Sequence, residues 1–269
     1  MELNYKNKNV QVEQKEKEFY DNYWKNFEIK KITGRLEIPE VSNLKGSKIL
    51  ICSCGSGIDT VYAANAGADV YAFDISSTAV EMARVVAKNN NVNINAEVMD
   101  FHSLKYENDT FDYIYGTDIL HHIDCDRAGK ELFRCLKPGG VAFFWENSDR
   151  NPILRFFRRM LFGKPGGYQK NKFLFFRRDG TTDEYPLTED EVKILSDIFE
   201  GHLKRIYRVF YFFQLLSRFG WKNKFYNKFL FNFDKFIAKI FPFMMKYSFE
   251  QGIWMQKIIT KKNIINKNN

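Results

Sequence analysis

The stretch from Lys48 to Asp74, KILICSCGSGIDTVYAANAGADVYAFD, decides the fold of this chain. An apolar run over Lys48–Cys52 predicts a buried strand, and the small residues of Ser53–Gly57 predict a tight turn. A helix is expected over Ile58–Ala66, followed by a second strand over Asp69–Phe73 that is closed by an acidic residue. This succession is half of a doubly wound sheet, and its glycine turn is a place where a ligand can approach the backbone.

Length and composition favour one large globular domain with room for an insertion. The chain has 269 residues, of which 45% are apolar, and this is enough for a sizeable core. Its four cysteines have neither a disulfide framework nor zinc-ligand spacing, which favours a reducing, cytoplasmic compartment. The N-terminal residues are charged throughout, and no run of about 18 apolar residues is present to span a bilayer. We therefore expect a cytoplasmic protein, with peripheral attachment to a membrane as the alternative.

The net charge of +8 is concentrated in the C-terminal half. Residues 203–247 contain ten Lys or Arg and one acidic residue, and residues 155–178 contain eight basic residues and no acidic one. A regional excess of one sign predicts a partner for that region, which is either an anionic membrane or a nucleic acid.

Strands and helices alternate regularly beyond the opening stretch. ISSTAVEMARVVAKNNNV predicts a serine-capped helix, NAEVMD a third strand ending at Asp100, FDYIYGTDI a fourth strand, AGKELFRCL a helix, KPGG a turn and VAFFWEN a fifth strand. This alternation predicts a parallel sheet whose ligand site lies outside the carboxyl ends of its strands. A further helix is expected behind Thr188, and the last two strands in HLKRIYRVFYF and GIWMQKIITKK.

Residues Lys48–Asn147 resemble the class I S-adenosylmethionine-dependent methyltransferases, in the group with LHH after the fourth strand and LKPGG before the fifth. The resemblance implies an α/β fold with a doubly wound, seven-stranded, Rossmann-like sheet, and S-adenosylmethionine as the cofactor. In one place the chain departs from the family, where LDxGCGxG is replaced by LICSCGSG, with Ile51 and Ser53 in place of the acid and the first glycine. The missing acid normally helps to orient the loop and the amino group of the cofactor.

The cofactor is expected to lie against the glycine turn and the ends of the following strands. The turn lets the backbone pass close to the methionine part of the cofactor, and Asp74 is placed to accept hydrogen bonds from both ribose hydroxyls. The resemblance puts Asp100 beside the adenine amino group, with Phe101 as apolar cover, and Gly116 and Thr117 along the cofactor. The expected cofactor-binding residues are Ser53, Cys54, Gly55, Ser56, Gly57, Asp74, Ile75, Asp100, Phe101, Gly116 and Thr117.

The candidate catalytic residues lie in DILHHID, just after the fourth strand. His121 or His122 would act as the base for an acceptor that must lose a proton, since the ordinary pKa of histidine lies near neutrality. Packing of one histidine against the sheet is the structural alternative. A metal site with Asp118 lacks a clear third ligand, so no metal is expected.

Four parts are expected along the chain. These are an N-terminal helical lid (1–40, with a helix over Val12–Lys31), the cofactor-binding core (41–148), a basic aromatic insertion on the substrate side (149–187), and the C-terminal part of the core (188–269) with a helical insertion at about 212–250. In that insertion a helical projection places Lys224, Lys228, Lys235, Lys239 and Lys246 in one stripe beside an aromatic face.

The functional hypothesis is transfer of a methyl group to an oxygen, nitrogen or carbon of a small-molecule or lipid-like acceptor. The lysine stripe has two interpretations, which are an amphipathic helix packed on the core with solvated lysines and a helix that lies in the interface of an anionic membrane, where it would hold the active site over a lipid-like acceptor. One alternative is an RNA methyltransferase, which TDILHH disfavours because it lacks the Asn or Asp followed by Pro-Pro and an aromatic residue that such enzymes commonly have. The other alternative is a module that binds the cofactor or docks on a membrane without turnover, which the altered first-strand pattern keeps open.

Overall fold

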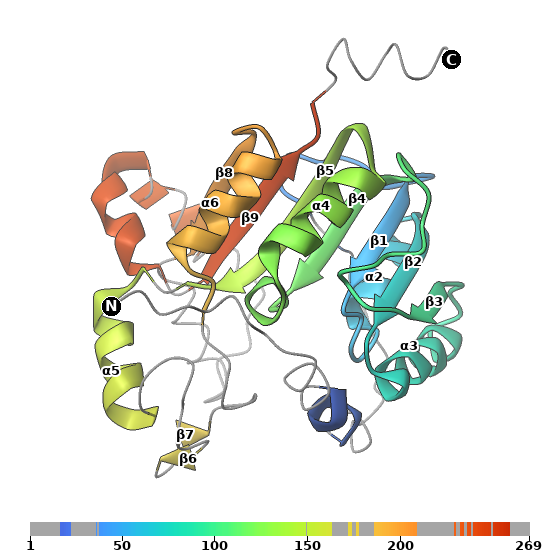
Figure 1. The fold of residues 1–269 in the computed structure, drawn as a ribbon, viewed down its shortest axis with the longest axis horizontal. Helices are drawn as coiled ribbons and strands as arrows, with labels where there is room; N and C mark the ends of the chain where they lie inside the picture. The colour runs from blue at the N-terminus through green and yellow to red at the C-terminus, as the bar shows by residue number, and fades with distance from the viewer. Residues whose placement is uncertain are drawn as a thin grey trace. The chain divides into compact units, whose positions relative to one another are not determined.

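The computed structural model describes residues 17–22, 36, 38–148, 150–162, 172–173, 176–177, 186–208, 229, 232–233, 236–237, 239–248 and 250–258 (Figure 1). The chain divides into two compact units. The first unit comprises residues 1–144, 193–203 and 254–269, and the second comprises residues 145–192 and 204–253. The four sequence parts proposed above remain predictions.

A seven-stranded sheet organises the fold, in the order β3-β2-β1-β4-β5-β9-β8. The strands β1, β2, β3 and β4 pair in parallel, as expected, whereas β9 runs opposite to β5 in Figure 1. The expected doubly wound, seven-stranded sheet is therefore confirmed, and it is mixed. The chain order reverses between β1 and β4, and in such sheets the ligand site lies at this point. The strands are β1 (Lys48–Cys52), β2 (Asp69–Asp74), β3 (Asn95–Val98), β4 (Phe111–Thr117), β5 (Leu136–Asn147), β8 (Leu203–Arg208) and β9 (Glu250–Gln256).

Several helices begin at a residue whose side chain caps them. The hydroxyl of Ser76 accepts a hydrogen bond from the amide of Ala79 at 3.1 Å, and Asp124 caps the next helix in the same way. Thr188 and Glu191 form a reciprocal capping box, with the Thr188 amide donating to the Glu191 carboxylate at 2.9 Å. The helices are α2 (Ile58–Asn65), α3 (Ser77–Asn89), α4 (Cys125–Cys135), α5 (Pro152–Phe162) and α6 (Glu189–Ile198).

The core of the first unit is centred on β1. Ile49, Leu50 and Ile51 are all buried, although successive side chains of a strand point to opposite faces. A strand covered on both faces gives an unbroken apolar run rather than an alternating one, and this explains the sequence LIC after Ile49. Phe73 and Phe111 are buried on the neighbouring strands and complete this core.

Three predicted boundaries were wrong. The third strand ends at Val98, so that Asp100 lies in the following turn, and the fourth strand ends at Thr117. The segment KPGG is part of β5 instead of a separate turn, with Gly139 at a φ of 87°. A left-handed glycine inside a strand bends it locally and keeps the strand continuous.

The second unit contains α5, a short hairpin and a 3-10 helix. The hairpin pairs β6 (Lys172–Phe173) with β7 (Phe176–Arg177), and the 3-10 helix η3 covers Pro242–Tyr247. Residues 229, 232–233, 236–237 and 239–240 are helical, while the helical insertion expected at about 212–250 stays a prediction. The predicted stripe lysines Lys224, Lys228 and Lys235 lie outside the described residues. None of the described helices combines the length and apolar character needed to cross a membrane.

Candidate active site

The turn after β1 is held in left-handed backbone conformations. Ser53, Gly55 and Gly57 have φ angles of 51°, 48° and 77°. The amide of Cys54 donates to the carbonyl of Phe73 at 2.9 Å, which ties the turn to the end of β2. A Cβ on Gly57 would lie 2.6 Å from the Cα of Ala83 in α3, so this glycine is required for helix packing. The close approach of α2 to α3 is thus a reason for a glycine at position 57, in addition to the expected room for the cofactor.

Asp74 lies where the end of β2 meets this turn. Its carboxylate accepts hydrogen bonds from the amide of Gly55 at 3.0 Å and from the amide of Ser76 at 2.9 Å. The side chain is buried, and this burial raises the pKa of Asp74 even though the amides of Ser76 and Gly55 oppose the shift. A backbone hydrogen bond from Ile75 lowers this pKa as well, and because a carboxylate has about four lone-pair sites, it can still accept from a further donor. Ile75, which follows, is half-buried.

Two other residues of the turn, Cys54 and Ser56, differ in burial. Cys54 is buried, and burial together with the nearby Asp74 charge raises the pKa of its thiol well above the usual value. The thiol therefore stays protonated and is a poor nucleophile at neutral pH. Ser56 is half-buried between the two glycines.

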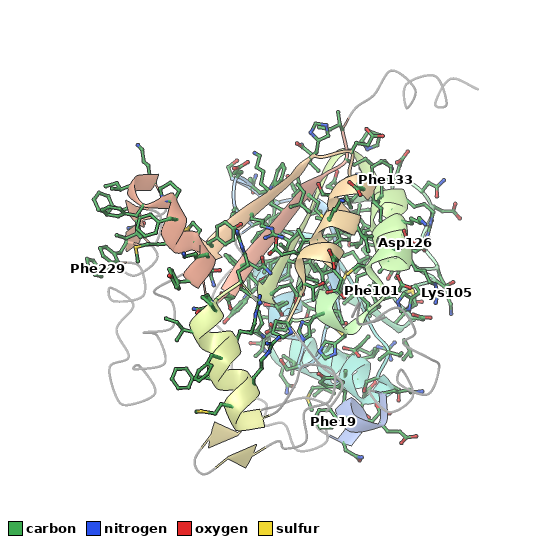
Figure 2. The ribbon with its side chains drawn as sticks, turned by 60° about the vertical axis from the view of Figure 1, so that its left-hand side comes forward. Phe19, Phe101, Lys105, Asp126, Phe133 and Phe229 are labelled. Atoms are coloured by element: carbon green, nitrogen blue, oxygen red, sulfur yellow. The ribbon has the colours of Figure 1, made fainter. Side chains whose placement is uncertain are left out.

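Asp100 and Phe101 follow β3 in a turn organised by a histidine that the sequence did not single out. The Asp100 carboxylate accepts from the amide and the Nδ1 of His102, both at 2.9 Å. The Nε2 of His102 in turn accepts from the amide of Asp124, at the start of α4, at 3.1 Å. Phe101 is buried edge-on against Phe73 at 5.2 Å between ring centroids and is labelled in Figure 2. His102 thus fixes the turn that carries Asp100.

Gly116 and Thr117 end β4 beside β1. Gly116 pairs with Cys52, and a Cβ on Gly116 would lie 2.7 Å from the ring of Phe144. The hydroxyl of Thr117 donates to the carboxylate of Asp59 at 3.3 Å. Asp59 lies in the first turn of α2 and was not predicted from the sequence, although its place just after the glycine turn could have drawn attention to it.

His121 and His122 lie on a 3-10 helix, η1 (Leu120–His122), instead of the first turn of an α-helix. Both side chains are buried, and their ring centroids are 4.2 Å apart. The hydroxyl of Tyr20 lies 3.4 Å from the Nε2 of His122, with the two rings edge to face. These positions are compatible with both expectations for the two histidines, which are packing against the sheet and a role as base.

Tyr20 belongs to the helical residues 17–22, which lie inside the predicted N-terminal helix. The next residue, Asp21, accepts hydrogen bonds from the hydroxyl of Ser76 and from the amide of Thr78 at the start of α3. Burial opposes ionisation of Asp21, but these hydrogen bonds dominate and lower its pKa. One short segment thus contacts both the histidine pair and the start of the helix that follows Asp74.

The residues around the turn suit a cationic nucleoside ligand. Two carboxylates, Asp74 and Asp59, flank the glycine turn at the point where the strand order reverses. S-adenosylmethionine carries a sulfonium, an ammonium group and two ribose hydroxyls, which are the charges and donors that carboxylates bind. The donor set therefore fits this cofactor.

The strand order, the glycine turn after β1 and the acid that ends β2 together define the class I methyltransferase fold. The solved structure of a SAM-dependent methyltransferase from Methanosarcina mazei is similar to this one, with a TM-score of 0.53 and 19% identity, and the match covers 83% of this chain and 99% of that one. Phosphoethanolamine N-methyltransferase 2 of Haemonchus contortus, solved with S-adenosyl-L-methionine, is also similar, with a TM-score of 0.52 and 16% identity over 82% of this chain and 50% of that one.

The sequence comparisons agree with the fold. Residues 50–144 match the family model described as the methyltransferase domain. The ubiquinone biosynthesis O-methyltransferase of Coxiella burnetii (strain Dugway 5J108-111) is 32% identical over 108 residues, which are 40% of this chain and 46% of that protein. The chain thus matches about half the length of this curated relative. Residues 50–144 are thus similar to a methyltransferase domain in sequence, on a fold that the class I methyltransferases share.

Proposed function

We propose that the protein transfers the methyl group of S-adenosylmethionine to a small-molecule acceptor. The observation that carries this proposal is the Asp74 carboxylate, which joins the glycine turn to the start of α3 and can still accept from a further donor. A buried carboxylate with that capacity, next to a left-handed turn, suits the ribose of an adenosine.

The residues of this chain would bind and orient the cofactor. Asp74 would accept from the ribose hydroxyls, while Asp100, held by His102, would accept from the adenine amino group. Phe101 would cover the adenine, and Gly116 and Thr117 would border the methionine part. The bound cofactor supplies an electrophilic methyl group on its sulfonium, and alignment of the acceptor with that methyl accounts for most of the acceleration.

An oxygen acceptor is favoured by the curated relatives, which are named ubiquinone biosynthesis O-methyltransferases. A hydroxyl acceptor must lose its proton during transfer, and this requires a base. We assign this role to His122, because the Tyr20 hydroxyl at its Nε2 can hold the ring in one orientation. His121, whose tilted ring lies 4.2 Å from that of His122 between centroids, is the second candidate for the base.

A lipid-like acceptor at a membrane surface is the finer form of this proposal. It is supported by the apolar side chains that the second unit exposes, among them Phe156, Phe236 and Phe243. An enzyme held at a bilayer meets membrane-dissolved acceptors at high local concentration.

Two measurements test the proposal. Calorimetric titration with S-adenosylmethionine should give saturable binding to the wild type and at least tenfold weaker binding to Asp74→Ala, because hydrogen bonds to a charged group are worth about 1.5–3 kcal/mol each. Tritiated methyl transfer into a cell lysate, partitioned between organic solvent, protein, RNA and water-soluble metabolites, should place label in a small-molecule fraction. Label in RNA would support the RNA alternative, and binding without any transfer would overturn the enzymatic proposal.

A further inference from the structure

The end of β1 lacks the carboxylate that the class has there. Ile51 stands at that position and is buried and apolar. Asp59, in the first turn of α2, brings a carboxylate back to the same region from a different element. The turn between them, Ser53–Gly57, is only five residues long.

Asp59 reaches across the point where the strand order reverses. Its carboxylate accepts a hydrogen bond from Thr117 at the end of β4, and β4 is the strand paired with β1. The ligand of a doubly wound sheet lies above this point. The methionine part of an adenosyl ligand held by Asp74 would end in the same place.

A first-turn acid can also serve only the helix dipole, and α4 provides an example. Asp126 lies in the first turn of α4, has a half-exposed side chain and forms an ion pair with Lys130 of its own helix at 2.7 Å. Asp59 instead contacts another strand, and burial raises its pKa against the effect of the Thr117 hydrogen bond. A desolvated carboxylate of this kind is stabilised by a cation placed beside it.

We propose that Asp59 binds the α-amino group of the methionine part of S-adenosylmethionine and so replaces the carboxylate that β1 lacks. This inference rests on the proposed function. Asp59 lies outside the LDxGCGxG pattern, so the sequence did not mark it as a cofactor contact.

Binding titrations with three ligands separate this role from a structural one. S-adenosylmethionine and S-adenosylhomocysteine carry the amino group, whereas 5′-methylthioadenosine has the same adenine, ribose and thioether but no amino acid part. Asp59→Asn should weaken binding of the first two by about tenfold or more and change the affinity for methylthioadenosine by less than about twofold. The matched control Asp126→Asn, which also removes a first-turn acid, should leave all three affinities unchanged.

Three outcomes would overturn the assignment. If Asp59→Asn weakens all three ligands equally, Asp59 shapes the turn and does not bind the amino group. If it changes none of them, Asp59 has no role in binding. If the wild type binds none of the three, the proposed function fails together with this inference. Thermal unfolding of Asp59→Asn should occur at the wild-type temperature or above it, because neutralising this acid removes a desolvation cost and the amide oxygen can still accept from Thr117.

A separate observation concerns the second unit, where α5 exposes an apolar stripe. Ile153, Phe156, Phe157 and Met160 are spaced as i, i+3, i+4 and i+7, so they lie on one side of the helix. Their exposed fractions lie between 47% and 62%. A stripe at this spacing normally faces the core of a protein, whereas this one faces outward.

The segment near η3 exposes further apolar side chains in the same unit. Phe236, Ile240, Phe241 and Phe243 are exposed, and the side-chain amide of Asn151, just before α5, donates to the carbonyl of Tyr247 at 2.7 Å. Figure 2 shows Phe229 projecting outward from the helical segment that precedes η3. We define the apolar face as Ile153, Phe156, Phe157, Met160, Phe236, Ile240, Phe241 and Phe243.

Cations accompany the apolar face. Arg159 on α5 is exposed, as are Lys239 and Lys246 near η3, and the sequence of α5 contains no acidic residue. Aromatic side chains bordered by cations are the composition of helices that lie in the interface of an anionic bilayer, with the rings among acyl chains and the charges at the phosphates.

We propose that the apolar face docks the second unit onto the surface of an anionic membrane. Charge complementarity identifies the partner. The cations beside the apolar face are attracted to an anionic bilayer, whereas a neutral bilayer or an apolar protein partner offers them no opposite charge.

Vesicle sedimentation tests the proposal with paired variants. The wild type should sediment with vesicles of phosphatidylglycerol and phosphatidylcholine at low salt, much less with pure phosphatidylcholine, and less as salt increases. Arg159→Gln with Lys239→Gln should lower the partition coefficient by about tenfold or more, whereas the charge-matched pair Lys88→Gln with Lys130→Gln on the first unit should not. Phe156→Ser with Met160→Ser should abolish binding, and Val98→Ser, at an exposed apolar residue of the first unit, should not.

Other results would overturn the docking proposal. A wild type that stays in the supernatant with anionic vesicles at low salt would do so directly. A wild type that forms dimers, with the Phe156→Ser and Met160→Ser variant monomeric by light scattering and neither binding vesicles, would make the apolar face an interface between two copies. Binding of the same strength to neutral vesicles would remove the role of the cations. All of these results are independent of methyl transfer.

Discussion

At the scale of single residues, one side chain serves both the fold and the proposed cofactor site. Asp74 ends β2, accepts from Gly55 in the turn and accepts from Ser76 at the cap of α3. These amide contacts are the kind that hold a turn in place, and the carboxylate that makes them is also the proposed acceptor for the ribose hydroxyls. The sequence alone predicts Asp74 as a cofactor contact, because it ends the second strand. Its second role, which is to hold the turn and the start of α3, is seen only in the hydrogen bonds of the structure.

The first prediction is that the affinity for S-adenosylmethionine falls as the pH is lowered through the raised pKa of Asp74. Burial lifts this pKa above its ordinary value of 3.8, and ribose hydroxyls donate to the ionised form, so protonation competes with binding. The free energy of unfolding changes in the opposite direction. It falls as the pH rises from 3.8 to the raised pKa of Asp74, because the unfolded chain loses its proton first. Calorimetric titrations at decreasing pH measure the affinity, and Asp74→Asn should bind weakly with no such dependence. A wild-type affinity that stays constant down to the acid limit of the fold would contradict the prediction.

The second prediction concerns Ser53, a non-glycine residue in the left-handed region at a φ of 51°. Ser53→Gly should raise the free energy of unfolding by about 0.5–1 kcal/mol, because relief of a strain of about 1–2 kcal/mol exceeds the extra chain entropy of glycine. Asn91, at a φ of 56°, is a matched control in which Asn91→Gly should gain less, since asparagine tolerates this region better. Urea denaturation measures both, and a destabilised Ser53→Gly would mean that the serine side chain contributes to the fold.

At the scale of elements, the position of the site depends on how closely α2 approaches α3. Both helices follow strands of the parallel half of the sheet, and Gly57 lies at their point of contact. The N-terminal segment 17–22 adds a third element that reaches α3 through Asp21 and η1 through Tyr20. The site is thus formed by helix starts around the strand ends.

The third prediction is that Gly57→Ala is much more destabilising than Gly46→Ala. Both glycines have left-handed φ angles, 77° and 75°, so both variants carry about 1–2 kcal/mol of backbone strain. Only Gly57→Ala also forces a Cβ to 2.6 Å from Ala83, whereas nothing lies within 4 Å at Gly46. Overpacking adds about 1–3 kcal/mol, which denaturant titration of the two variants should resolve. Equal losses would show that α3 moves aside without cost.

The fourth prediction tests the contact between the N-terminal segment and η1. Tyr20→Phe keeps the ring beside His122 and removes only the hydroxyl at 3.4 Å from Nε2. The rate of single-turnover methyl transfer should fall by about tenfold, since a misoriented base loses part of the 100-fold or greater contribution of general base catalysis, with cofactor affinity unchanged. Tyr62→Phe, at another half-buried tyrosine of the first unit, is the control. A loss of cofactor affinity instead of rate would identify Tyr20 as part of the cofactor site.

At the scale of the whole molecule, the sequence predicts the sheet better than it predicts the site. The strands β1 and β2, the caps at Ser76 and Thr188 and the final strands follow from local apolar runs and capping side chains, which act over a few residues. The contacts of Asp59 with Thr117 and of Tyr20 with His122 join residues 58 and 102 positions apart, and no local pattern encodes such pairs. The same holds for the outward stripe of α5, since its spacing is that of an ordinary core-facing helix.

The four cysteines have a practical consequence for experiments in solution. Cys52, Cys54, Cys125 and Cys135 are all buried thiols that form no disulfide. Burial raises the pKa of Cys52 and Cys54 and brings that of Cys135 to about 11. Thiol-reactive dyes require an accessible thiolate, so we expect the four cysteines of the native protein to react with them only slowly. A single cysteine introduced at an exposed position of α5 or of Tyr20's segment would then carry a reporter without removing any natural thiol, and slow labelling of the four natural cysteines would measure how often the native core opens.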